Sequence, residues 1–208
     1  MTQVAEAVAE RLERGRRLVA WARACLVEKL GGAAAVRPSA AWCKEPGATF
    51  VTLHWRDGRL QGCIGSIEPQ RPIVEDVEHN AIAAACHDPR ARPITLLDVD
   101  DLEIELSLLS PLEPIAFRDE ASALAALRPG VDGVVIECGG DRATFLPSMW
   151  SRLPAVTAFM EALKAKAGLP ANFWRADIKL WRYAVDRHTD APGAPGEHPK
   201  GWKGPTHR

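Results

Sequence analysis

The sequence lacks most of the features that assign a protein to a class at first sight. Its five cysteines form no C-x-x-C pair and are odd in number, which argues against both a zinc site and a disulfide framework. No window approaches the roughly 18 consecutive apolar residues that a membrane span needs. The N-terminus carries glutamates and arginines before any apolar stretch, unlike a secretory signal. We therefore predict a soluble, cytoplasmic protein that does not bind membranes and keeps its thiols reduced.

Neither sign of charge is in excess, since 26 Lys and Arg residues face 27 Asp and Glu residues, for a net charge of −1. Bulk nucleic-acid binding would need a concentrated basic surface, so we do not expect it. The motifs G-x-G-x-x-G, Walker A, H-E-x-x-H and G-x-S-x-G are also absent. We predict no metal ion and no cofactor.

The residues that are present have a globular pattern, with 47% apolar residues spread along most of the 208 positions. This length favours one domain, or one core with a smaller lobe. Hydrophobic periodicity and turn signals predict helices over 2–30, 72–88, 120–127 and 158–167, hairpins over 49–67 and 134–146, and strands over 102–109 and 178–185. Short hairpins enforce antiparallel pairing, so the predicted fold class is α+β.

Beyond Arg187 the composition shifts to Pro, Gly, His and Lys without periodicity. Such a segment buries too little apolar surface to fold, so we predict a disordered tail over residues 187–208. Three histidines of this tail are interpreted as solvated and not as metal ligands: His188, His198 and His207.

The segment LQGCIG at 60–65 is the most informative, because two glycines flank Cys63 inside a predicted strand. A turn centred on Asp57-Gly58 pairs residues whose numbers sum to 115, so one sheet face would carry Thr52, His54, Gln61 and Cys63. In this register His54 faces Gln61 and lies diagonal to Cys63, about 7 Å away between Cβ atoms, where an imidazole could help generate a thiolate. The alternative is that Cys63 is a small buried hydrophobe, the commonest fate of a free cysteine.

Two further groups could carry chemistry. Arg90 follows the predicted end of a helix at Asp88-Pro89, and its guanidinium could bind a carboxylate or phosphate, although such a turn more often only organises a loop. Glu103 and Glu105 share one face of the alternating strand LEIELSLL. They could form an acid/base pair or a metal site, or they could simply be solvent-exposed.

Six blocks of this sequence resemble, in order and spacing, the AmmeMemoRadiSam system protein A family, also called the AMMECR-one domain family. They are LQGCIG at 60–65, AIAAACHDPR at 81–90, DDLEIELSLLSP at 100–111, LRPGVDGVVI at 127–136, FLPSMW at 145–150 and KAGLP at 166–170. The resemblance covers about residues 18–185. It implies a domain over 18–186, preceded by the N-terminal part of the first helix at 1–17 and followed by the tail at 187–208.

The resemblance implies an antiparallel sheet flanked by helices, a smaller second lobe, and a cleft between the lobes as the site. It also implies two partners, a Memo-like protein and a radical SAM protein, but no settled reaction. The family hallmark is similar to L-R-G-C-I-G, so Gln61 replaces its usual arginine, and Ala91 stands where phenylalanine usually follows D-P-R. The replacement of arginine by Gln61 removes a positive charge.

Two hypotheses follow. In the first, the chain is an enzyme component whose cleft holds Cys63 and His54 as catalytic residues. The substrate, a small molecule or a peptide, would be bound by Gln61, Gly62, Gly65, Arg90, Glu103 and Glu105. In the second, the chain is a non-catalytic binding or scaffold module for the two partners, and Cys63 is structural.

Overall fold

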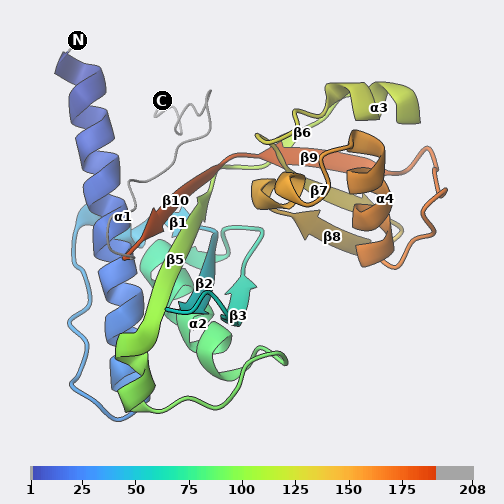
Figure 1. The fold of residues 1–208 in the computed structure, drawn as a ribbon. Coiled ribbons are helices and arrows are strands. Elements are labelled where there is room, and N and C mark those ends of the chain that lie inside the picture. Colours follow the sequence, from blue (N-terminus) through green and yellow to red (C-terminus); the bar gives the residue numbers. More distant parts are fainter. Residues whose placement is uncertain (1, 191–208) are drawn as a thin grey trace. The chain divides into compact units, whose positions relative to one another are not determined.

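The structure is a computed structural model that describes residues 2–190, with side chains from residue 5 onwards. The chain divides into two compact units (Figure 1). Unit 1 contains the described residues up to Leu109 together with those from Asp186, and unit 2 contains Ser110–Val185. The second unit is therefore inserted into the sequence of the first.

Unit 1 is built on a four-stranded sheet in the order β10-β5-β2-β3. Its strands are β2 (Thr49–Trp55), β3 (Leu60–Gly65), β5 (Leu102–Leu109) and β10 (Val185–Thr189). A two-stranded sheet pairs β1 (Pro46–Gly47) with β4 (Arg71–Pro72). The helices are α1 (Thr2–Lys29) and α2 (Ile73–Cys86), with short 3-10 helices η1 (Ala41–Lys44) and η2 (Leu96–Asp101).

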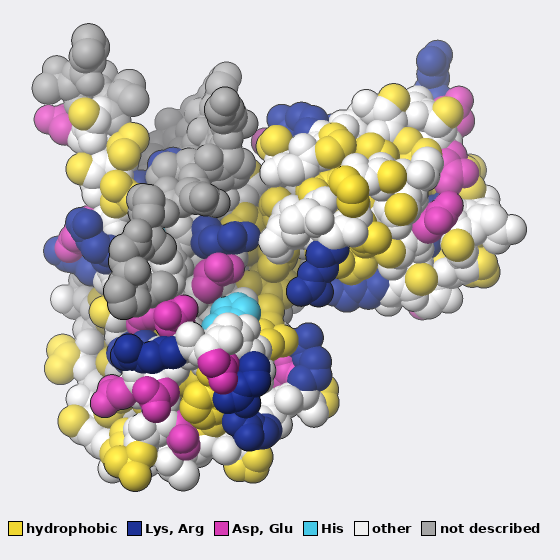
Figure 2. All heavy atoms as spheres, in the orientation of Figure 1, with side chains coloured by type: hydrophobic (Ala, Val, Ile, Leu, Met, Phe, Trp, Pro, Cys, Tyr) yellow, Lys and Arg dark blue, Asp and Glu magenta, His cyan; other side chains and the backbone are white. Residues whose placement is uncertain are grey.

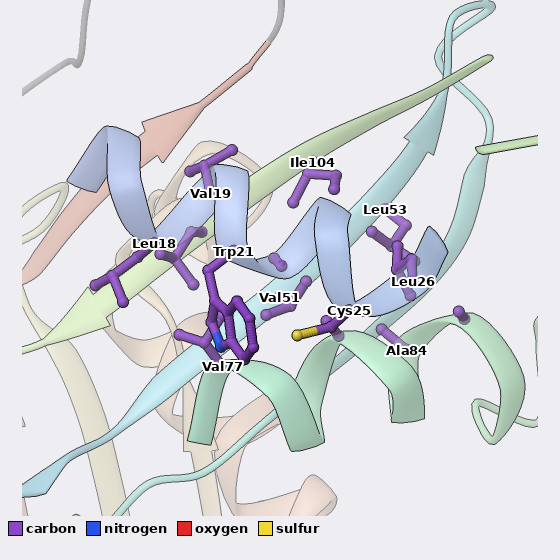
Figure 3. Close-up of a cluster of buried hydrophobic side chains, with 14 of the residues drawn as sticks. Leu18, Val19, Trp21, Cys25, Leu26, Val51, Leu53, Val77, Ala84 and Ile104 are labelled. Atoms are coloured by element: carbon purple, nitrogen blue, oxygen red, sulfur yellow. The ribbon is translucent and has the colours of Figure 1, made fainter. Parts of the chain in front are cut away.

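Both long helices pack on one face of this sheet (Figure 3). From α1, Leu18 and Leu26 are fully buried against Val51 of β2 and Ile104 of β5. Because side chains alternate along a strand, every second residue of β2 and β5 points into this core. The Cys25 sulfur lies between α1 and α2, as Figure 3 shows. The core thus uses one face of the sheet and leaves the other for polar groups.

Unit 2 has a sheet and a buried core of its own. Its strands run in the order β6-β9-β7-β8, with β6 at Glu113–Pro114, β7 at Gly133–Cys138, β8 at Asp141–Phe145 and β9 at Lys179–Tyr183. Helices α3 (Glu120–Ala126) and α4 (Val156–Lys166) and the 3-10 helix η3 (Pro147–Ser151) complete the unit. In its core the Trp150 ring stacks on Phe159 with 3.7 Å between centroids. Helices and antiparallel sheets together confirm the predicted α+β class.

The end of the described chain differs from the prediction. The strand expected over 178–185 is two strands, β9 and β10, and β10 continues to Thr189. His188 is buried, with Nε2 3.0 Å from Asp186 Oδ2, and a Cβ at Gly15 of α1 would overlap its ring. The interpretation of His188 as solvated is therefore wrong, because the ring packs against α1. His198 and His207 lie outside the described residues.

None of the helices in the described part of the chain combines the length and apolar character that crossing a membrane requires. On the face seen in Figure 2, positive and negative side chains are interspersed over unit 1.

Candidate functional site

The sheet face of unit 1 that points away from α1 and α2 carries the side chains of four predicted site residues: Cys63, His54, Glu103 and Glu105. We call it the polar face and define it by Phe50, Thr52, His54, Cys63, Glu103, Glu105 and Ser107. Most of these residues are half-buried. The strand register places Cys63 opposite Thr52, and Thr52 opposite Glu105. Directly opposed side chains have Cβ atoms about 4.5–5.5 Å apart, so a thiol, a hydroxyl and a carboxylate form one row across three strands.

The Cys63 thiol accepts a hydrogen bond from the Thr52 hydroxyl, with 3.1 Å between Oγ1 and Sγ. Burial raises the pKa of this thiol above its ordinary value, because a thiolate is poorly solvated there. The Thr52 hydrogen bond and the positive charge of Arg90 lower the pKa, whereas Asp88 and Glu105 raise it further. The net direction is upward, so Cys63 is a neutral thiol at neutral pH.

His54 is on the polar face, but its register differs from the prediction. A β-bulge between Leu53 and His54 shifts the pairing, so His54 lies opposite Leu60 on one side and Glu103 on the other. The predicted pairing of His54 with Gln61 is therefore wrong. In the described part of the chain no hydrogen bond or ion pair joins the imidazole to Cys63. Its role as a base remains a prediction.

Gln61 does not share the face of Cys63. It is 1% exposed, accepts a hydrogen bond from Trp55 Nε1 at 3.0 Å and donates one to the Arg92 carbonyl at 2.6 Å. The bulge adds one residue to β3, which turns the Gln61 side chain towards the buried side. The expectation that Gln61 lies beside Cys63 is thus wrong. The Gln61 side chain is instead hydrogen-bonded to Trp55 and Arg92 and has a structural role.

Both glycines that flank Cys63 have packing reasons. A Cβ at Gly62 would overlap the backbone carbonyl of Ala84 in α2, so the helix approaches the strand too closely for any side chain. A Cβ at Gly65 would overlap the Phe50 ring. The predicted signal of close approach was correct, but what approaches is a helix backbone and a ring. These two glycines are therefore explained by packing and do not indicate a bound ligand.

Arg90 is held by a neighbour that the sequence did not single out for a role. Its Nη2 and Nε donate to Asp88 at 2.7 and 3.0 Å, and the same carboxylate accepts the Cys63 backbone N–H at 2.8 Å. The Arg90 hydrogen bonds hold the pKa of Asp88 well below its ordinary value, helped by the Cys63 N–H and opposed by burial. Asp88 thus ties the outer edge of β3 to the end of α2. Arg90 is committed to this pair and offers a ligand only its remaining N–H groups.

A second buried carboxylate, Asp76, was also missed. Its Oδ2 accepts hydrogen bonds from Thr49 N, Thr49 Oγ1 and Asn80 Nδ2, and its Oδ1 accepts one from Ser66. The network joins the start of α2 to the start of β2 and the end of β3. An Asp in the first turn of a helix usually interacts with the helix N-terminus, so no sequence signal pointed to these partners.

The two glutamates of the polar face have different surroundings. Glu105 Oε1 lies 3.4 Å from Arg187 Nε of β10, whereas Glu103 lies opposite His54. Among the described residues no group of three or more His, Cys, Asp or Glu side chains is arranged to hold a metal ion. The polar face therefore offers a thiol, a hydroxyl, carboxylates and an imidazole for hydrogen bonding.

Comparison with known proteins supports the resemblance seen in the sequence. The AMMECR1 family model matches residues 19–188. Protein MJ0810 of Methanocaldococcus jannaschii is 37% identical over 180 residues, 83% of this chain and 88% of that protein. A protein of Thermotoga maritima is 36% identical over 146 residues, 70% of this chain and 79% of the relative.

A solved structure has the same fold. The uncharacterized protein PH0010 from Pyrococcus horikoshii is similar over 90% of this chain and 97% of its own, with a TM-score of 0.78 and 29% identity. The family match spans most of the chain, including both units and all six sequence blocks. This chain therefore belongs to the AMMECR1 family.

Proposed function

We propose that this chain is the substrate-binding component of a modification system that includes a Memo-like protein and a radical SAM protein, with the polar face around Cys63 as its site. The observation that carries the proposal is the row of Cys63, Thr52 and Glu105 on a sheet face that neither α1 nor α2 covers. The cleft implied by the family resemblance remains a prediction, and the proposal rests on groups that unit 1 supplies by itself.

Three observations favour binding over covalent chemistry at this face. The raised pKa of Cys63 keeps the thiol neutral, and a neutral thiol is a poor nucleophile. Arg90, the predicted anion binder, is paired with Asp88. The flanking glycines are explained by packing. A neutral thiol and a hydroxyl beside a carboxylate are instead suited to hydrogen-bonding a polar small molecule or peptide.

A second candidate function is nucleophilic catalysis by Cys63, with His54 as its base and Arg90, Glu103 and Glu105 orienting the substrate. Two observations favour it. The Thr52 hydroxyl donates to the sulfur, and Arg90 adds a nearby positive charge, both of which stabilise a thiolate. Substrate binding that strengthened these interactions would lower the pKa of the thiol. The third alternative is a scaffold for the two partners, in which Cys63 is only packed.

One reconstitution experiment distinguishes the three candidate functions. The chain is mixed with purified Memo-like and radical SAM proteins encoded in the same genome, and 5′-deoxyadenosine release from SAM is measured together with partner co-purification. The variants are Glu105→Gln and Cys63→Ser, with Glu10→Gln as the control because Glu10 is an exposed carboxylate on α1.

A substrate-binding role predicts that Glu105→Gln lowers the rate about tenfold, while Cys63→Ser keeps most of it, because a hydrogen bond to a charged group is worth about 1.5–3 kcal/mol. Nucleophilic catalysis predicts that Cys63→Ser abolishes turnover. A scaffold predicts that both variants act like Glu10→Gln. If the wild-type chain neither binds the partners nor changes their product, the proposal is wrong.

A further inference from the structure

Strand β5 places three polar residues on the polar face in succession: Glu103, Glu105 and Ser107. Residues two apart on a strand point the same way and lie about 7 Å from each other, so the row spans about 14 Å. One small cation can contact both glutamates, but it cannot also reach Ser107. A ligand that uses all three residues therefore needs two polar groups that are separated along the strand.

Ser107 carries a hydroxyl that the fold leaves without a partner. The residue is only 3% exposed, yet its hydroxyl makes no hydrogen bond with any described residue. The oxygen itself is not sealed from solvent, so a molecule at the polar face can reach it. Most buried polar side-chain atoms in proteins are hydrogen-bonded, because an unpaired one costs free energy. The partner of Ser107 is therefore a group from outside the fold.

Glu103 is a second polar group without a partner. It is half-buried and lies opposite His54, but within the described part of the chain no hydrogen bond or ion pair joins its carboxylate to the imidazole or to any other residue. Glu105 differs, because Arg187 Nε lies 3.4 Å from its Oε1. Partial burial of a carboxylate is costly unless a cation or a donor pairs with it. Glu103 thus favours a positively charged ligand.

The charges of the polar face and of the adjoining edge of β3 leave this region negative. Its carboxylates and guanidiniums belong to Glu103, Glu105, Asp88, Arg90 and Arg187. Three carboxylates thus accompany two guanidiniums, and each guanidinium is already paired with a carboxylate. A cation is therefore attracted to this face and an anion is repelled.

Phe50 adds an apolar surface beside the polar row. Its half-buried ring lies against Gly65, where a Cβ would overlap it, and the strand register places it opposite Ser107. An aliphatic chain that runs along β5 from the glutamates to Ser107 can pack beside this ring, as the stems of long charged side chains do on apolar surfaces.

We propose that the polar face binds a lysine residue of a peptide substrate. The ammonium donates to Glu103 and Glu105, the four-carbon stem lies beside Phe50, and a peptide group of the ligand bonds to the Ser107 hydroxyl. An extended lysine side chain places its Nζ about 6 Å from its Cα, which suits the separation between the glutamates and Ser107. The lysine would be the substrate group of the site around Cys63, so its assignment rests on the proposed function.

The test titrates the isotopically labelled full chain with the peptide acetyl-Gly-Lys-Gly-amide and follows the backbone NMR signals of β5. A peptide with norleucine in place of lysine keeps the four-carbon stem and lacks the ammonium, whereas butylamine keeps the ammonium and lacks the peptide groups. We expect saturable shifts with the lysine peptide, about tenfold weaker binding of the norleucine peptide and about threefold weaker binding of butylamine, because each probe loses one of the two polar contacts.

Variants of the two ends of one ion pair should change binding in opposite directions. Glu103→Gln should weaken binding of the lysine peptide about tenfold, because the ammonium loses a carboxylate. Arg187→Gln should tighten it about threefold, because Glu105 is released from its own cation. Glu10→Gln, at an exposed carboxylate of α1, is the control for net charge and should leave the affinity unchanged.

Ser107→Ala separates a ligand contact from a structural role. It should weaken the lysine peptide about threefold and leave butylamine unaffected, and it should not lower the melting temperature, because the hydroxyl has no partner among the described residues. A loss of stability without any change in peptide affinity would mean that Ser107 serves the fold.

Three other results would overturn the proposal. They are norleucine peptide binding as tightly as lysine peptide, shifts that do not saturate, and Glu103→Gln and Arg187→Gln changing affinity in the same direction. Butylamine binding as tightly as the lysine peptide would exclude a peptide as the ligand.

The isolated chain is used, so the result does not depend on the two partner proteins. If the lysine peptide does not bind while Glu105→Gln still slows the reconstituted system, the lysine assignment alone is wrong. If the peptide binds but the chain has no effect on the partners, the proposed function is wrong and the ligand class stands.

Discussion

The two faces of the unit 1 sheet are made by the same strands and have opposite characters. On the face under α1 and α2, Val51, Leu53 and Ile104 are fully buried. The next residues along the same strands, Thr52 after Val51 and Glu105 after Ile104, are half-buried polar residues on the other face. A strict alternation of residue types assigns stability to one face and leaves the other free for chemistry.

Strand β3 departs from this division. Its bulge brings Gln61 and Gly62 to the buried side in succession, and Cys63 and then Gly65 return to the polar face. The six hallmark residues thus serve two purposes. Gln61 and Gly62 fit the strand under α2, whereas Cys63 places its thiol on the polar face. A motif that looks like one site in the sequence is partly a packing motif.

The largest expected effect tests the apolar face. Ile104→Ala should lower the free energy of unfolding by about 4 kcal/mol, because a fully buried side chain is lost and a cavity remains. The neighbouring polar-face change Glu103→Gln should cost less than about 0.5 kcal/mol. Urea unfolding of both variants measures the contrast. Similar losses in the two would mean that the polar face also carries part of the core.

The next effect tests the close contact under β3. Gly62→Ala should destabilise the protein by about 3 kcal/mol, because the new Cβ meets the Ala84 carbonyl and a helix backbone cannot move aside cheaply.

Gly65→Ala brings its Cβ against the Phe50 ring, a side chain and not a helix backbone, so it should cost less, about 2 kcal/mol, and Phe50→Ala in the same chain should relieve that clash. Thermal unfolding gives the ranking. If Gly62→Ala proved as mild as Gly65→Ala, the explanation by α2 contact would fail.

A smaller effect tests the tie between the sheet edge and the end of α2. Asp88→Asn should cost about 2 kcal/mol at pH 7, because the charged hydrogen bonds from Arg90 weaken. The folded-state pKa of Asp88 is depressed, so its stabilisation is present above the unfolded pKa of about 4 and is lost as the pH falls below it. The gap between wild type and variant should narrow from pH 6 to pH 3, whereas Asp100→Asn, at an exposed carboxylate, should show no such gap.

The elements that were predicted from the sequence are those fixed by local pattern. Alternation over 102–109 gave the correct strand and the correct two faces, and Asp57-Gly58 gave the hairpin that joins β2 and β3. What failed depends on distant partners. Hydrophobic periodicity does not predict which distant residues meet. It therefore missed the bulge at His54, the contact of Gly62 with Ala84 and the hydrogen bond from Cys63 to Asp88. His188 was misassigned because its burial depends on a glycine in the first helix.

The smallest effect compares cysteines on the two faces. Burial raises the pKa of Cys25, under the helices, to about 12, and raises that of Cys63 on the polar face as well. Cys86 is exposed. Alkylation by iodoacetamide, followed by mass spectrometry across pH 7–10, should therefore modify Cys86 first, Cys63 later and Cys25 only on unfolding, since the thiolate is the reacting form.

The hydrogen bond from the Thr52 hydroxyl to the Cys63 sulfur distinguishes this thiol from one that is only packed. Thr52→Val removes a donor that stabilises the thiolate, so the pKa of Cys63 should rise further and its alkylation at pH 8.5 should slow about threefold. Cys86 in the same sample is the control and should react at an unchanged rate. An apparent pKa for Cys63 below about 8.5 would contradict the assignment of a neutral thiol and favour catalysis. If Thr52→Val left the alkylation rate unchanged, the hydrogen bond would not affect the thiolate, and burial would dominate the pKa of Cys63, as it does for Cys25.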